Sequence, residues 1–222
     1  MPDPFSLRGQ RVLITGAAGG IGSATARICH QQGAELVLCD LKAPTALAED
    51  LRAAGGAAEA VALDVTDRAA TERLVQELTR LDAVVANAGK CCWDDWTDPD
   101  WDAEFWTTID VNLLSAIHLT RAVLPKLRAD GGGSVVLVAS VAGRMGGLRA
   151  SPHYVAAKGG VITLVKWLAN KAAPSGVRVN GVAPGATDTA MTRDQTFDTE
   201  AIPLGRVAAP SEIAAPIVFL CS

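Results

Sequence analysis

A glycine-rich stretch near the N-terminus constrains the fold of this chain more than any other feature. Residues 15–22 read Thr-Gly-Ala-Ala-Gly-Gly-Ile-Gly, follow an apolar run at 12–14 and precede an alanine-rich segment. This order predicts a strand, a tight glycine turn and the start of a helix. Because Gly16, Gly20 and Gly22 carry no Cβ, a pyrophosphate can approach the N–H groups of that helix start. The stretch predicts a nucleotide site, with an ordinary strand-to-helix turn as the alternative.

An acidic residue follows the next apolar run. This run, at 34–39, ends in Asp40, about twenty residues beyond the glycine turn. A carboxylate at this point of the fold can accept hydrogen bonds from a ribose diol, and it repels a 2′-phosphate. Asp40 therefore predicts NAD rather than NADP as the cofactor.

Apolar runs alternate with helical segments along the rest of the chain. Further strands are expected at 61–65, 81–86, 134–139 and 177–183, and helices at 43–54, 105–127, 152–173 and 212–220. The alternation predicts an α/β fold of one domain over residues 1–222, a single doubly wound parallel sheet (a Rossmann fold) with helices on both faces. Asp67 can cap one more helix. The segment 187–203 has no clear periodicity and is either a lid over a ligand or an ordinary surface loop.

Composition narrows the class of function. The 222 residues carry a formal net charge of −4, which argues against a nucleic-acid partner or an anionic membrane surface. Neither a secretory leader nor a bilayer-spanning run is expected, so the chain is expected to be cytoplasmic. The five cysteines form no Cys-x-x-Cys pair and are expected to be reduced. No metal site is assigned to the adjacent pair Cys91 and Cys92.

A tyrosine and a lysine share one face of an expected helix. Tyr154, the chain's only tyrosine, precedes Lys158 by four residues. A tyrosine with an ordinary pKa of about 10 is almost fully protonated at pH 7 and is a poor general base. An ammonium within about 4 to 6 Å lowers that pKa, so Lys158 is expected to activate Tyr154. Ser140, which follows the strand expected at 134–139, can bind a substrate oxygen. The alternative is a surface tyrosine stacked on a lysine stem.

With these residues, the sequence resembles the short-chain dehydrogenase/reductase family from about Leu7 to Ser222. The resemblance rests on residues 15–22, Asp40, Asp64-Val65, Asn87-Ala88-Gly89, Val111-Asn112, Ser140, Tyr154-x-x-x-Lys158 and Pro184-Gly185-x-x-x-Thr189. It implies a catalytic tetrad in which Asn112 holds a water of a proton relay, made of Asn112, Ser140, Tyr154 and Lys158. It also implies an NAD-binding set of Thr15, Gly16, Gly20, Ile21, Gly22, Asp40, Asp64, Val65, Asn87, Ala88, Gly89, Tyr154, Lys158, Pro184, Gly185 and Thr189.

The activity expected from this resemblance is hydride transfer between NAD and a small-molecule secondary alcohol or its ketone. Tyr154 would be the general acid/base and Ser140 would orient the oxygen. One alternative is an NADPH-dependent 3-ketoacyl-type reductase, against which Asp40 counts. Another is a catalytically silent nucleotide-binding regulator on the same fold.

The resemblance also bears on assembly. The family continues beyond the point that corresponds to Ser222 into a last strand, so the strand at 177–183 would be left as an open sheet edge. We expect a shortened form of a longer chain, or another segment or subunit that covers this edge. Assembly as a homodimer or homotetramer is expected through the helices at 105–127 and 154–173.

Overall fold

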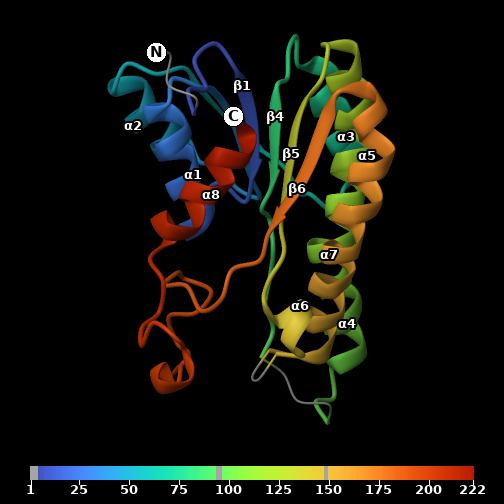
Figure 1. Cartoon of the computed structure of the whole chain (residues 1–222). Helices are drawn as coiled ribbons and strands as arrows, with labels where there is room; N and C mark the ends of the chain where they lie inside the picture. Colours follow the sequence, from blue (N-terminus) through green and yellow to red (C-terminus); the bar gives the residue numbers. More distant parts are fainter. Residues whose placement is uncertain (1–4, 94–96, 148–149) are drawn as a thin grey trace.

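The strands form one parallel sheet. The computed structural model describes residues 5–93, 97–147 and 150–222 (Figure 1). Its described strands are ordered β3-β2-β1-β4-β5-β6, with bounds β1 Arg11–Thr15, β2 Glu35–Asp40, β3 Ala58–Ala62, β4 Ala83–Ala86, β5 Gly133–Val138 and β6 Val177–Val182. The helices are α1 Gly20–Gln31, α2 Thr45–Ala53, α3 Arg68–Glu77, α4 Trp101–Ile109, α5 Ser115–Ala129, α6 Ala142–Met145, α7 Pro152–Ala172 and α8 Pro210–Cys221. The predicted doubly wound sheet is confirmed, and its strand order reverses between β1 and β4.

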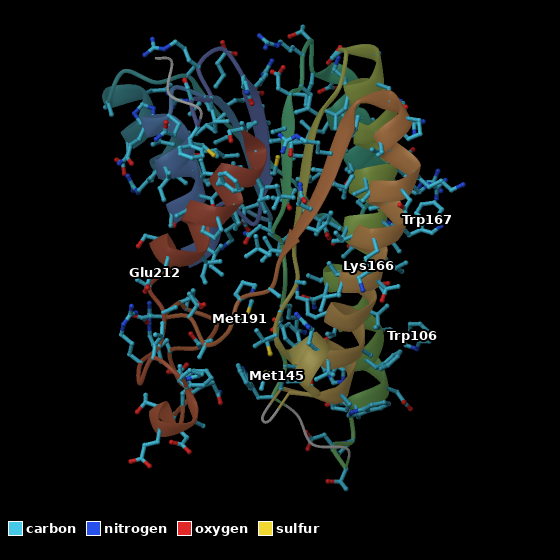
Figure 2. All side chains as sticks on the ribbon, viewed as in Figure 1. Trp106, Met145, Lys166, Trp167, Met191 and Glu212 are labelled. Atoms are coloured by element: carbon cyan, nitrogen blue, oxygen red, sulfur yellow. The ribbon has the colours of Figure 1, made fainter. Side chains whose placement is uncertain are left out.

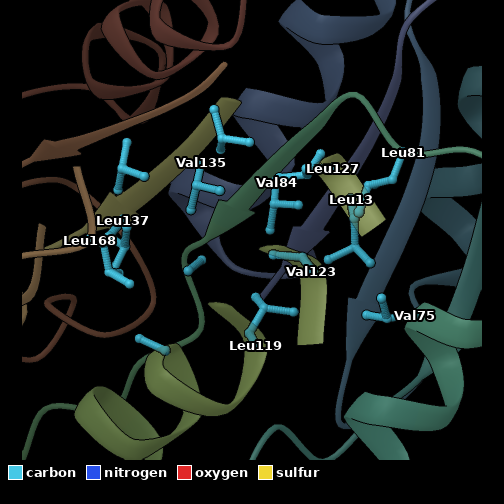
Figure 3. Close-up of a cluster of buried hydrophobic side chains, with 14 of the residues drawn as sticks. Leu13, Val75, Leu81, Val84, Leu119, Val123, Leu127, Val135, Leu137 and Leu168 are labelled. Atoms are coloured by element: carbon cyan, nitrogen blue, oxygen red, sulfur yellow. The ribbon is translucent and has the colours of Figure 1, made fainter. Parts of the chain in front are cut away.

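Helices cover both faces of the sheet, as strands that are apolar on both sides require. Figure 1 shows α1, α2 and α8 over one face and α3, α5 and α7 over the other. Side chains that alternate along the strands supply two cores. Leu13, Val84 and Val135 face Leu119 and Val123 of α5 in one core (Figure 3), and the neighbouring residues Val12, Val85 and Val136 belong to the other. This packing brings the carboxyl ends of β1, β4 and β5 to one edge, where the site lies.

The third strand lies three residues earlier than the sequence predicted. The expected range was 61–65, but β3 pairs with β2 from Leu36 opposite Ala58 to Asp40 opposite Ala62. The error has a physical reason, because β3 is an edge strand whose small and polar residues leave it without an apolar run. The residues at 63–65 instead leave the sheet, and Asp64 accepts hydrogen bonds from the backbone N–H and the hydroxyl of Thr66 at 2.9 and 2.7 Å.

The helix expected at 105–127 is longer and interrupted. It begins with α4 at Trp101, passes through a π-helical turn at Asp110–Leu114, and continues as α5 to Ala129. Asn112 lies within the turn, and its side-chain amide donates to the Thr108 carbonyl at 2.9 Å. A side chain that occupies the carbonyl four residues earlier competes with the regular helical bond, which accounts for the wider turn.

The stretch between β5 and α7 contains the short helix α6. His153, at the start of α7, is fully buried, and its ring contacts those of Trp101 and Phe105 at centroid distances of 5.7 and 6.2 Å. The first turn of α7 is thus held against α4, which fixes the direction of the helix that carries Tyr154.

Strand β6 forms one edge of the sheet. Among the described residues it pairs only with β5, as the sequence predicted. Val177 and Val179 are buried, whereas Arg178 is exposed and donates to the Leu220 carbonyl of α8 at 3.3 Å. In the part of the chain that the structure describes, no helix is long and apolar enough to cross a membrane.

Candidate active site

The glycine turn between β1 and α1 packs so closely that side chains are excluded. Gly16 has a φ of +64°, in the left-handed region that favours glycine. A Cβ on Gly22 would lie 2.1 Å from the Gly16 carbonyl oxygen, and a Cβ on Gly20 would lie 2.7 Å from the Cγ2 atom of Thr189. Ile21 lies between the last two glycines and packs on the core below α1. The predicted glycines therefore form a bare backbone surface at a helix N-terminus, which suits a pyrophosphate.

Thr15 and Asn87 join this turn to the end of β4. The Thr15 hydroxyl accepts hydrogen bonds from the N–H groups of Asn87 and Ala88, both at 3.2 Å. The Asn87 side-chain amide donates to the carbonyls of Thr15 and Gly16 at 3.1 and 3.0 Å. These contacts fix the 87–89 segment beside the glycine turn. Gly89 continues toward the centre of the site, since a Cβ there would lie 2.9 Å from Asn112 Oδ1 and 3.4 Å from Lys158 Nζ.

Two acidic residues lie on the other side of the glycine turn. Asp40, at the end of β2, accepts hydrogen bonds from the N–H groups of Ala18 at 2.9 Å and Leu41 at 2.8 Å. Its carboxylate is therefore held at the edge of the turn. Asp64 follows β3 as described above, and Val65 lines a small internal cavity with Thr15 and Ala88. Asp40 and Asp64 thus lie at the ends of β2 and β3, on the side of β1 away from β4.

The segment after β6 closes the opposite side. The Pro184 carbonyl accepts from Val141 N–H at 2.9 Å, and the Gly185 carbonyl accepts from the Thr187 hydroxyl at 3.1 Å. Thr192 organises the remainder, because its hydroxyl accepts from Thr189 N–H at 3.1 Å and donates to the Thr187 carbonyl at 2.6 Å. Thr189 is thereby placed against Gly20. Sequence reasoning missed the role of Thr192, because this residue lies three positions beyond the motif that ends at Thr189.

Ser140, Tyr154 and Lys158 come together at the end of β5. Ser140 is buried, and its hydroxyl accepts from Ala142 N–H at 3.1 Å and is hydrogen bonded to Tyr154. Lys158 Nζ donates to the Val138 carbonyl at 3.0 Å and lies 5.8 Å from the centroid of the Tyr154 ring. Asn112 faces the same space from the π-helical turn. All four residues of the expected tetrad thus surround one point beside the glycine turn.

The protonation of the site differs from the sequence-based expectation. Burial raises the pKa of Tyr154 to about 12, the nearby Cys91 raises it further, and the Ser140 hydrogen bond acts in the opposite direction. Burial lowers the pKa of Lys158 to about 8. The expected lowering of the tyrosine pKa by Lys158 is not seen in the chain alone, where desolvation is the largest effect. Tyr154 is therefore a protonated phenol at neutral pH, ready to donate.

Sequence reasoning missed a second group of contacts beside the tetrad. Lys90 and Cys92, in the loop after β4, both contact the carboxylate of Glu104 on α4. Glu104 is separated from them by the loop that leads into α4, and no spacing rule connects them. Near this part of the fold, Met145 and Met191 lie exposed on α6 and on the segment after β6 (Figure 2).

The arrangement fits a nicotinamide dinucleotide. The bare glycine surface would take the pyrophosphate, and Asp40 would face the adenosine ribose. A Cβ at Gly16, Gly20 or Gly22 would collide with Ala88, Thr189 or the Gly16 carbonyl, so a larger residue would displace the turn that forms this surface. When bound there, such a cofactor supplies the hydride acceptor or donor. Beside this cradle lies the Tyr154 hydroxyl, which is hydrogen bonded to Ser140.

Comparisons with known proteins agree with this geometry. Residues 10–200 match the family model described as short chain dehydrogenase. A 3-oxoacyl-[acyl-carrier-protein] reductase of Thermotoga maritima is 36% identical over 97% of this chain and 92% of its own length. L-rhamnose 1-dehydrogenase (NAD(P)(+)) of Azotobacter vinelandii is 33% identical over 95% and 89%. The solved structure of a 3-oxoacyl-[acyl-carrier protein] reductase from Brucella melitensis with bound NAD has a TM-score of 0.90 and 31% identity over 98% of this chain and 86% of that one.

Proposed function

The chain belongs to the short-chain dehydrogenase/reductase family and is an oxidoreductase, and we propose that it transfers a hydride between NAD and a secondary alcohol or its ketone. The observation that carries this proposal is the meeting of Ser140, Tyr154 and Lys158 beside the glycine turn. In ketone reduction, the Tyr154 hydroxyl gives its proton to the carbonyl oxygen as the hydride reaches the carbon. In oxidation, the phenolate takes that proton back. Ser140 would hold the oxygen in both directions.

The preference for NAD rests on Asp40. Its carboxylate is fixed by two backbone N–H groups at the edge of the glycine turn, so it cannot easily turn away from a bound ribose. A 2′-phosphate placed there would meet a like charge, which costs several kcal/mol when the groups are close. We expect the value of kcat/KM to be at least about tenfold higher with NAD than with NADP.

Asp40→Asn tests this preference, because it removes the charge and keeps the shape. The ratio of kcat/KM for NAD over NADP should fall about tenfold or more. Asp50→Asn is the matched control, since it removes a carboxylate that pairs with Arg27 on the protein surface. Equal efficiency with both cofactors in the unmodified protein would contradict the proposal.

A 3-ketoacyl-type reductase is the second candidate. The Thermotoga maritima relative, a 3-oxoacyl-[acyl-carrier-protein] reductase, favours it. A panel of secondary alcohols, simple ketones and a 3-ketoacyl thioester, each assayed with both cofactors, separates the two activities. A turnover rate with the thioester and NADPH well above every other combination would select the second candidate.

We further propose that the chain assembles as a homodimer or homotetramer through α4, α5 and α7. Trp106 on α4 and Trp167 on α7 are 64% and 58% exposed (Figure 2). Exposed aromatic side chains on neighbouring helices are typical of a protein interface.

Light scattering should give a multiple of 23.0 kDa, and Trp167→Glu should shift the mass toward the monomer. Leu204→Glu, which changes an exposed residue outside these helices, is the control. A monomer in the unmodified protein would refute this assembly.

A further inference from the structure

A carboxylate on α4 holds both ends of the short loop after β4. One oxygen of Glu104, Oε2, accepts from Lys90 Nζ at 2.5 Å and from the Cys92 thiol at 3.1 Å. The Cys92 thiol also lies 3.3 Å from the Thr108 hydroxyl, one turn further along the helix. We call Lys90, Cys92 and Glu104 the Glu104 clamp.

The loop in this clamp connects two members of the tetrad. The backbone of Lys90 is bound by Asn112, whose Oδ1 accepts from Lys90 N–H at 3.2 Å and whose amide donates to the Lys90 carbonyl at 2.7 Å. At the other end of the loop, the Cys92 carbonyl accepts from Ser151 N–H at 3.2 Å. Ser151 precedes Tyr154 by three residues at the start of α7. A displacement of this loop would therefore move Asn112 and Tyr154 relative to each other.

Cys91 lies at the centre of the loop, where its thiol donates to the Cys92 carbonyl at 3.5 Å. It raises the pKa of both Tyr154 and Lys158, in each case after the larger effect of burial. It is half-buried, whereas Cys29, Cys39, Cys92 and Cys221 are buried. Burial raises the pKa of the Cys39 and Cys221 thiols to about 12, and that of Cys29 well above its ordinary value. A thiol reagent should therefore react first at Cys91, and its rate reports the position of the loop.

We propose that Glu104 is a positioning residue for turnover, which holds the 89–92 loop so that Asn112, Tyr154 and Cys91 keep their places around the substrate oxygen. The proposal rests on the function proposed above. Glu104 and Lys90 are 37% and 38% exposed, and ion pairs this exposed contribute only about 0 to 1 kcal/mol to stability. The consequence of losing the clamp should thus be seen in catalysis rather than in unfolding. A displacement of about 1 Å at a reacting group can cost up to 10²-fold in rate.

Glu104→Gln is the first test. The neutral amide keeps the size of the side chain but loses the charge that holds the ammonium and the thiol. We expect kcat to fall about tenfold, while the NAD dissociation constant stays within about twofold, because the glycine turn and Asp40 are untouched. Labelling of Cys91 by a maleimide, followed by mass spectrometry, should be several-fold faster. This labelling needs no substrate, so it tests the clamp even if the proposed reaction is wrong.

The chain offers a matched control. Glu72 on α3 pairs with Arg68 at 2.7 Å, is 38% exposed, and lies on a helix that carries none of the site residues. Glu72→Gln should leave kcat and the labelling rate within about twofold of the unmodified protein. Lys90→Met, which removes the other partner and keeps an apolar stem, should reproduce Glu104→Gln. The double variant should be no worse than Glu104→Gln alone, since Glu104→Gln already breaks the contact that Lys90→Met removes.

Two results would overturn the proposal. One is a Glu104→Gln variant whose kcat and Cys91 labelling match those of Glu72→Gln. The other is a loss of activity in Glu104→Gln and Lys90→Met that comes with an equal loss of NAD binding and of thermal stability, which would show a purely structural role. A fall in kcat with unchanged NAD affinity and faster labelling in both variants would support positioning.

Discussion

Replacing Tyr154 by phenylalanine is expected to lower kcat by about 10² to 10⁴-fold, the usual contribution of a general acid or base. The phenol is the group that would exchange a proton with the substrate oxygen, and it is hydrogen bonded to Ser140. The ring itself remains, so its packing at the start of α7 is preserved. Because the glycine turn and Asp40 do not contact the hydroxyl, the NAD dissociation constant should stay within about threefold.

The pH dependence should distinguish this role from a structural one. Burial raises the pKa of Tyr154 to about 12, so the phenolate fraction of the chain alone grows with pH up to that value. Alcohol oxidation needs the phenolate and should become faster between about pH 7 and 10, and the phenylalanine variant should lose this dependence on Tyr154. Ser151→Ala is the matched control, because it removes another buried hydroxyl at the start of α7. Activity above about one hundredth of normal in Tyr154→Phe would disprove the assignment.

The parts of this site that could be predicted from sequence depend on contacts between close neighbours in the chain. The glycine turn follows its strand directly, and the bare backbone at Gly22 is a local requirement of that turn. Tyr154 and Lys158 are one helical turn apart, so helix geometry alone places them on one face. The alternation of apolar strands and helices was sufficient for the doubly wound sheet, since each apolar strand had to be covered on both faces.

The parts that could not be predicted depend on pairings across the fold. Strand β3 was placed too late because Ala58 and Ala60 carry too little apolar surface to signal a strand, and its register is set by β2. The burial of His153 depends on Trp101 and Phe105, which approach from another helix. The Glu104 clamp joins a loop to a helix. Lys90, Cys92 and Glu104 are residue types that are common in loops and helices, so none of them marks the contact in the sequence. The protonation of Tyr154 depends on how deeply the fold buries it, which the spacing to Lys158 does not reveal.

Replacing Lys158 by methionine is expected to remove turnover and weaken NAD binding, yet to stabilise the fold at pH 7. The ammonium is buried and donates to the Val138 carbonyl at 3.0 Å. Its spare donors are the groups available for the hydroxyls of a nicotinamide ribose, and its charge is the one cation of the expected tetrad. We expect the NAD dissociation constant to rise about tenfold or more and kcat to fall at least about 10²-fold.

The stability part follows from the lysine pKa. Burial lowers it from its ordinary value to about 8, so the folded state holds the proton less tightly than the unfolded state. Below about pH 8 both states are charged and the folded state bears the full cost of burying the charge. Between there and the ordinary lysine value of about 10.4 the unfolded state binds more protons, so stability rises with pH in the unmodified protein. A shift of this size corresponds to about 3 kcal/mol, partly offset by about 1 kcal/mol for the Val138 carbonyl that loses its donor.

Thermal unfolding of both proteins at pH 7 and near pH 10 checks the sign. The methionine variant should have the higher Tm at pH 7, and the gain should shrink or disappear at the higher pH. Lys171→Met, on an exposed residue near the end of the same helix, is the control and should change Tm little at either pH. A variant with a lower Tm than the unmodified protein at pH 7, by the same margin at both pH values, would show that Lys158 is held as a stabilising neutral donor. In that case burying Lys158 would cost the fold no stability, and the proposal that the fold tolerates a destabilising charge for the sake of NAD binding and turnover would be wrong.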